Sequence, residues 1–221
     1  MSDDMLQKRT SGRYLSIFSD GSLREKTTKD NPDAVLREYE LKDGTKGEKW
    51  EVVYKSIIGR ITGISFRDGD YGQQLILEFT GKEGDVLNVT TNTSSNFGTD
   101  IMRRLPNVDL SKSVFFLPYS FEDDRGKDRR GVSIKIGDEK AENFFFDPVN
   151  KKTVNGFPEP TKEDMDKDDW KVHFIEVKKF LVDYTEKNII PKLEVKSNDI
   201  RESGDYPTAE DEGINPDDVP F

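Results

Sequence analysis

The sequence predicts a mainly β fold: a five-stranded barrel preceded by extra strands, followed by one amphipathic helix, and ending in an acidic tail. Between residues 35 and 136, short runs rich in Val, Ile, Leu and aromatic residues alternate with turns rich in Gly and Asp. Beyond them, apolar side chains recur at the three- and four-residue spacing of a helix: Trp170, Phe174, Val177, Leu181 and Tyr184. Residues 197–221 hold eight acids and one arginine. Such a segment buries too little apolar surface to fold, so a disordered tail is predicted.

Composition bounds the kind of protein. The 221 residues include 14 Phe, 7 Tyr and 2 Trp, enough for one hydrophobic core, so we expect a single domain over residues 13–190. The chain has no cysteine, which excludes disulfides and thiolate metal sites. Its first residues are polar, which predicts neither a signal peptide nor a membrane span and favours a cytoplasmic protein. Of the net charge of −10, the tail carries −7 and the rest of the chain only −3.

The N-terminal part is expected to supply the extra strands. Residues 1–12 are polar and predicted to be mobile, and a short strand over 14–18 then turns at the sequence SDG. After a loop around the sequence NP, strands are predicted over 35–41 and 49–66. If continuous, the second of these strands should bend where two glycines interrupt it: Gly59 and Gly63.

The middle of the chain completes the barrel. Four further strands are predicted, over residues 73–80, 86–91, 114–121 and 129–136. Between the second and third of them, Ser94 or Ser95 caps a short predicted helix that carries Phe97, Ile101 and Leu105 on one face. Together with the strand over 49–66, the order is three strands, one helix and two strands. That order is typical of the OB-fold, a five-stranded Greek-key barrel.

The C-terminal part of the domain is predicted to be irregular and then helical. Three prolines between residues 137 and 160 forbid a central strand there, so this segment should wrap the barrel. The helix over about 165–188 begins with acids, carries lysines later and stops before Pro191. Its apolar face could dock on the barrel or pair with a second copy, so a homo-oligomer stays open. Docking is the favoured alternative.

The sequence offers little for catalysis. His173 is the only histidine and sits on the apolar helix, which favours a structural role, and no Ser-His or Cys-His pair is available. Asp164, Asp166 and Asp168 resemble half a calcium loop that lacks its glycine and its glutamate. The acidic turn over 122–124 could hold magnesium, which leaves a metal-dependent nuclease as an alternative. We expect no enzyme activity, no cofactor and no metal.

Binding of single-stranded nucleic acid has more support. Such proteins pair a groove of Lys and Arg, which follows the phosphates, with aromatic side chains that stack on bases. The candidate basic residues are Arg60, Arg67, Arg103, Arg104, Lys112, Arg125, Lys127, Arg129, Arg130 and Lys135. The candidate aromatic residues are Trp50, Tyr54, Phe66, Tyr71, Tyr119 and Phe121. The densest basic run, RGKDRR, lies between the last two barrel strands, where an OB-fold places a loop beside its ligand. Strand parity, which separates stacking aromatics from core aromatics, stays open at this stage.

The last five residues carry a resemblance to a known family. The ending Asp217, Asp218, Val219, Pro220 and Phe221 resembles the C-terminal tip of bacterial single-stranded DNA-binding proteins, which usually has isoleucine where Val219 stands. The strand order and long helix resemble phage-encoded single-stranded DNA-binding proteins, which share the OB-fold and an acidic tail ending in Phe.

The resemblance implies a function and partners. It implies a non-enzymatic protein that coats single-stranded DNA in phage-like replication, recombination or repair, in the cytoplasm of the host. It also implies that residues 217–221 bind replication and recombination proteins, with Phe221 entering an apolar pocket and the aspartates steering the encounter. An adaptor whose barrel has lost its DNA groove is the alternative from another class.

Overall fold

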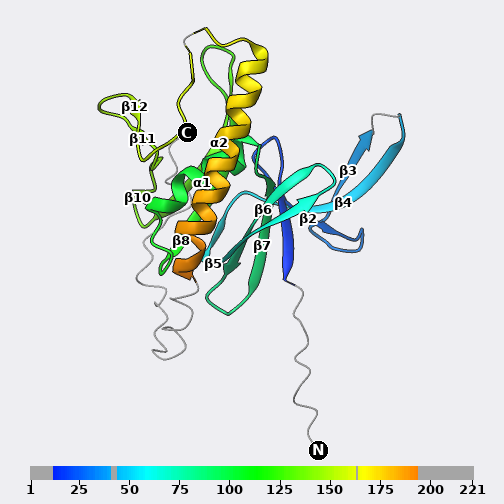
Figure 1. Ribbon diagram of the computed structural model, residues 1–221. Helices are drawn as coiled ribbons and strands as arrows, with labels where there is room; N and C mark the ends of the chain where they lie inside the picture. The colour runs from blue at the N-terminus through cyan, green and yellow to red at the C-terminus, as the bar shows by residue number, and fades with distance from the viewer. Residues whose placement is uncertain (1–11, 41–43, 163, 194–221) are drawn as a thin grey trace, which may run out of the picture.

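A computed structural model describes residues 12–40, 44–162 and 164–193 of the chain (Figure 1). Residues 1–11 of the predicted mobile N-terminus, the acidic tail and its tip lie outside these residues. The elements run in this order: β1 (Arg13–Ile17), β2 (Leu23–Thr27), β3 (Val35–Glu40), β4 (Lys46–Tyr54), β5 (Ile57–Gly69), β6 (Gly72–Thr80), β7 (Val86–Asn92), α1 (Asn96–Arg104), a 3-10 turn (Leu105–Asn107), β8 (Ser113–Glu122), β9 (Asp128–Ile136), β10 (Glu139–Lys140), β11 (Phe146–Asp147), β12 (Lys152–Thr153) and α2 (Lys167–Asn188). The fold is mainly β, as predicted.

One large sheet dominates the structure. Its strand order is β10-β9-β8-β5-β6-β7-β1-β2-β4-β3, and β11 and β12 form a separate small pair. The five strands expected to form the barrel are β5 to β9, and they are neighbours in this sheet in the order β9-β8-β5-β6-β7. The helix α1 falls between β7 and β8 in sequence, as predicted.

The sheet is not closed, so the predicted closed barrel is not confirmed. Closure of five strands would require β7 to pair with β9, but β7 pairs in parallel with β1, with Leu15 opposite Val89. On β9, the backbone N–H of Val132 donates to the carboxylate of Asp100 (2.7 Å), and the carbonyl of Ile134 accepts from the N–H of Ala141 (2.8 Å). The edges that would join are therefore already hydrogen-bonded to other parts of the chain.

The prediction of one long strand over residues 49–66 is wrong. The structure divides it into β4 and β5 at Lys55 and Ser56. The two strands are not neighbours, because β4 pairs with β2 and β3 whereas β5 pairs with β6 and β8. The register of β5 against β6 shifts between Ile61 and Gly63. This bulge lies where the glycines predicted a bend.

The hydrophobic core lies on one face of the sheet, which we call the inner face; the opposite face is the outer face. Phe79 and Phe116 are buried there with their rings edge to face, 5.3 Å apart between centroids. The helix α1 packs against β7 and β9 and adds Ile101 to this core, and the 3-10 turn that follows it adds Leu105. Its predicted cap is confirmed, since the Ser95 hydroxyl accepts from the N–H of Gly98 (3.0 Å).

The helix α2 docks on its own chain through its C-terminal half, the favoured alternative. Asp166 and Asp169 form a capping box at its start. Val177 and Leu181 join the core, whereas Phe174 in the N-terminal half is 62% exposed. Among the described residues, no helix is long and apolar enough to cross a membrane.

Candidate nucleic-acid interface

The strand register settles which candidate residues share a face. Directly opposed residues in an antiparallel pair lie on the same face, and side chains alternate along each strand. Arg60 lies opposite Thr80, and Arg67 lies opposite Gln74. Because positions 74 and 80 of β6 have the same parity, both arginines lie on one face despite the bulge between them. That face is the outer one, since the buried Leu75, Leu77 and Phe79 alternate with it.

The hairpin of β8 and β9 continues the outer face. Phe121 lies opposite Arg129, and Tyr119 lies opposite Gly131. The rings of Tyr119 and Phe121 are 5.8 Å apart between centroids, and Phe121 is 55% exposed. Two neighbouring aromatic side chains with a cation beside them are the arrangement on which unpaired bases stack.

Two more of the predicted basic residues lie on or beside this face. Lys135 lies opposite Phe115, on the outer face of β9. The exposed Lys112 directly precedes Ser113, which lies opposite Arg60. Tyr71 projects from the β5–β6 turn and is 89% exposed.

The β8–β9 turn is held together by the side chain of Asp123. The carboxylate of Asp123 accepts from the backbone N–H groups of Arg125 and Lys127 (3.0 Å each) and from Nε of Arg129 (2.8 Å). These hydrogen bonds, with that from Lys127 foremost, hold the pKa of Asp123 below its ordinary value. Among the described residues, no group of three His, Asp or Glu side chains is arranged to hold a metal ion.

The turn brings basic side chains together, but an equal number of acidic side chains balances their charge. Arg125, Lys127, Arg129 and Arg130 share residues 122–130 with four acids. Arg130 lies opposite Ser120, on the other face from Arg129, and pairs with Asp128 (3.0 Å). The predicted basic run is therefore a neutral hairpin with exposed cations at its tip.

Several predicted site residues are not on the outer face. Tyr54 lies opposite Leu23 on the inner face, and Trp50, four residues earlier on β4 and opposite Thr27, lies on the same face. The Tyr54 hydroxyl accepts from Arg13 and donates to Glu25 (3.2 Å), which in turn forms an ion pair with Arg13. Burial raises the pKa of Tyr54 above its ordinary value. The structure does not bring these two aromatics together with the rest of the candidate site.

Three further candidates are structural. Arg104 is buried, bonded to Asp100 (3.0 Å) and to the carbonyl oxygen of Ala141 (2.7 Å). Arg103 lies over the ring of Phe157, with 5.1 Å between the guanidinium carbon and the ring centroid. Phe66 packs against the core. His173, for which a structural role was expected, is buried against Trp170.

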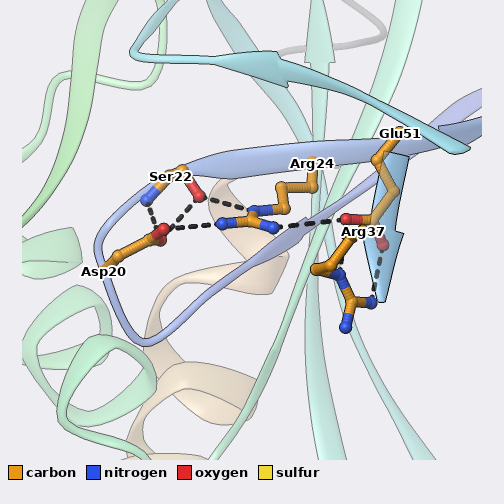
Figure 2. Close-up of polar contacts among 5 residues, drawn as sticks. All are labelled: Asp20, Ser22, Arg24, Arg37 and Glu51. Carbon is orange, nitrogen blue, oxygen red and sulfur yellow. Dashed lines mark hydrogen bonds and ion pairs between the residues drawn. The ribbon is translucent and has the colours of Figure 1, made fainter. Parts of the chain in front are cut away.

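The structure adds a polar cluster that sequence reasoning missed, shown in Figure 2. Glu51 is only 5% exposed and accepts two hydrogen bonds of 2.8 Å from Arg37, one from Nε and one from a terminal nitrogen. Arg24 lies within 3.4 Å of the same carboxylate and also donates to Ser22 (2.9 Å) and Asp20 (2.6 Å). The bonds from Arg37 are the main reason that the pKa of Glu51 lies below its ordinary value.

Aromatic rings accompany these cations. The guanidinium carbons of Arg24 and Arg37 lie 4.4 and 4.9 Å from the ring centroid of Phe18. The ring of Tyr39 lies 5.6 Å from Arg37 and 4.9 Å from Nζ of Lys49. The cluster went unseen in the sequence because β2, with its charged sequence LREKT, has no strand pattern, and its pairing with β4 creates the cluster.

Comparisons with protein-family models, with curated proteins and with solved structures found no match to this chain. The fold and the candidate site therefore define the class by themselves: an open, mainly β sheet whose outer face gathers exposed aromatic and basic side chains.

Proposed function

We propose that this protein binds single-stranded DNA without choosing a sequence and coats it during phage-like replication, recombination or repair. The observation that carries the proposal is the outer face, where Tyr119, Phe121 and Arg129 lie together on one hairpin and Arg60 and Arg67 lie farther along the neighbouring strand β5. Aromatic rings stack on any base and cations hold any phosphate, so binding has little sequence preference and weakens with salt.

The finer description of the fold belongs to the same proposal. The neighbour order β9-β8-β5-β6-β7 is the order of an OB barrel cut between its third and fifth strands. We propose that β5 to β9 are an OB-fold opened by the insertion of β1. The protein then acts in the cytoplasm, that of the host if it is phage-encoded.

The tail supplies recruitment in this proposal. Residues 217–221 bind replication and recombination enzymes, with Phe221 and its carboxylate in an apolar pocket rimmed by basic residues. The support is the resemblance of this ending to the tip of bacterial single-stranded DNA-binding proteins.

A titration tests the proposal. Fluorescent oligo-dT and a duplex of the same length are titrated with the full chain and with a chain lacking residues 217–221, at low and at moderate salt. Tight, salt-sensitive binding of the single strand alone, by both chains, is the expected result. Absence of binding by both chains would overturn it.

One observation favours a second candidate function. The hairpin tip over residues 122–130 has as many acids as bases, which weakens attraction to a polyanion. A protein–protein adaptor that acts through residues 217–221 alone would fit that balance. If the protein is such an adaptor, the full chain should capture a protein partner and should not bind oligo-dT.

A further inference from the structure

The hairpin of β3 and β4, which we call the arm, projects from the body of the sheet (Figure 1). Its two faces carry opposite charge. On the outer face, Arg37 lies opposite Lys49, and the neighbouring strand β2 places Lys26 opposite Glu51. On the inner face, Glu38 lies opposite Glu48, and Glu40 lies opposite Lys46.

The charge balance of each face follows from this register. The outer face of the arm and of β2 has four basic side chains, Arg24, Lys26, Arg37 and Lys49, against Glu51 and the nearby Asp20. The inner face of the arm has three glutamates and one lysine. A polyanion is therefore attracted to one face of the arm and repelled by the other.

The basic face of the arm also holds aromatic rings. Phe18 lies under Arg24 and Arg37, and Tyr39 lies beside Arg37 and Lys49. A Cβ at Gly47 would come within 2.5 Å of the Tyr39 ring, so the ring lies across this glycine. The aromatic and cationic groups that single strands require occur here for a second time.

The cluster is fixed before any ligand arrives. Glu51 on β4 bonds Arg37 on β3 and contacts Arg24 on β2, so one buried carboxylate joins three strands (Figure 2). Arg37 uses only Nε and one terminal nitrogen in these bonds. Its remaining terminal nitrogen and the exposed Lys26 and Lys49 are suited to phosphate oxygens.

The arm cluster adjoins the aromatic pair of the β8–β9 hairpin. A Cβ at Gly21, in the turn between β1 and β2, would lie 2.8 Å from backbone atoms of Tyr119 and Ser120. The turn that carries Asp20 and Phe18 therefore sits against β8. Contacts therefore connect Tyr119, through this turn and the ring of Phe18, to Arg37 on the arm.

We propose that the outer face of the arm is a second contact zone for single-stranded DNA, which receives the strand as it leaves the β8–β9 hairpin. This inference rests on the proposed function and deepens it. Lys26, Lys49 and Arg37 hold phosphates, and the ring of Tyr39 contacts a base. A DNA molecule that contacts the arm as well as the hairpin and β5 must be longer than one that contacts only the hairpin and β5.

Lys49 and Lys46 lie on the same strand, β4, but on opposite faces of the arm, and so provide a matched test. The full chain, a Lys26→Ala/Lys49→Ala variant and a Lys46→Ala control are titrated with oligo-dT of two lengths: about 8 nucleotides, within the site size of one OB domain, and about 24 nucleotides, which exceeds it. For the longer oligonucleotide, the double variant is expected to lose about tenfold in affinity. Its slope of log K against log salt is expected to fall by about 1.4, because two phosphate contacts are lost.

The controls make the result specific to the arm. The shorter oligonucleotide should bind the double variant as it binds the unchanged protein, and Lys46→Ala should leave both lengths unaffected. Equal binding of the longer oligonucleotide by the double variant and the unchanged protein overturns the arm proposal alone. If the unchanged protein binds neither length, the proposed function itself fails.

A second variant pair tests the aromatic contact. Tyr39→Leu is expected to weaken binding of the longer oligonucleotide by about 5- to 150-fold, the range for loss of one base stack, whereas Tyr39→Phe should bind normally. Thermal unfolding of both variants shows whether the arm survives. Normal binding by a folded Tyr39→Leu chain would rule out the stacking role.

Discussion

At the scale of single residues, Glu51 stabilises the arm by joining its strands to each other and to β2. Its carboxylate is buried between two guanidinium groups. Removing one partner of such a pair leaves uncompensated charge, which costs more than the pair itself contributes. The main effect of the ion pair is therefore to hold Arg37 in position. Because the guanidinium group of Arg37 packs on the ring of Phe18, it also helps to position that ring.

Glu51→Gln is expected to lower the free energy of unfolding by about 2 kcal/mol at pH 7, because both arginines lose their carboxylate. The pKa of Glu51 lies below its ordinary value of 4.5 in the folded protein. The stabilisation is therefore complete above that value and is lost as the pH falls through the folded-state pKa. Urea unfolding should be measured at pH 7 and at about pH 3.5. The difference in free energy of unfolding between the variant and the unchanged protein should be smaller at the lower pH.

Glu48→Gln is the matched control for this prediction, since Glu48 lies on the same strand but on the exposed inner face. It should change stability little at either pH. A Glu51→Gln gap that stays constant between the two pH values would show that the carboxylate charge is not what stabilises the arm.

At the scale of elements, sequence patterns predict what is locally encoded. The helix α1 could be predicted because Ser95, Phe97 and Ile101 combine a cap with an apolar face. The strand β2 could not, because its charged residues satisfy partners on β1 and β4 that are distant in sequence: Glu25 pairs with Arg13, and Arg24 contacts Glu51. The same limit explains why the β4–β5 break was missed, as both halves are apolar and only pairing separates them.

The junction of α1 with β7 gives a prediction at this scale. A Cβ on Gly98 would lie 2.3 Å from the carbonyl oxygen of Asn92, so the first turn of α1 could not rest on the end of β7. Gly98→Ala should lower the free energy of unfolding by about 2–4 kcal/mol, as overpacking against fixed backbone does. Gly81→Ala, where the nearest atom would be 3.9 Å away, should be close to neutral. Equal melting temperatures of the two variants would contradict this account.

At the scale of the whole molecule, part of the candidate site could be predicted from the sequence. Tyr119, Phe121 and Arg129 were identified as candidates and lie on one face. Trp50 and Tyr54 were placed with them only because strand parity and pairing were unknown, and both lie on the inner face. The arm cluster required the order β2-β4-β3 in the sheet, which no local pattern encodes.

The charge distribution of the whole chain leads to a last prediction. The residues from 197 onward carry −7 of the net −10. Because these acids are covalently linked to the domain, we expect them to compete with DNA for the basic side chains of the outer face. Removal of residues 197–221 should therefore raise the affinity for oligo-dT several-fold at low salt.

This gain in affinity should shrink as the salt concentration approaches about 0.3 M, because screening weakens the binding of the tail to the basic side chains as it weakens the binding of DNA. The informative control is a chain of full length in which the eight tail acids are replaced by their amides, Asp by Asn and Glu by Gln. If charge causes the competition, this chain binds like the truncated one. If it binds like the unchanged protein while truncation still raises affinity, the tail acts by occupying space, and the electrostatic account of autoinhibition fails.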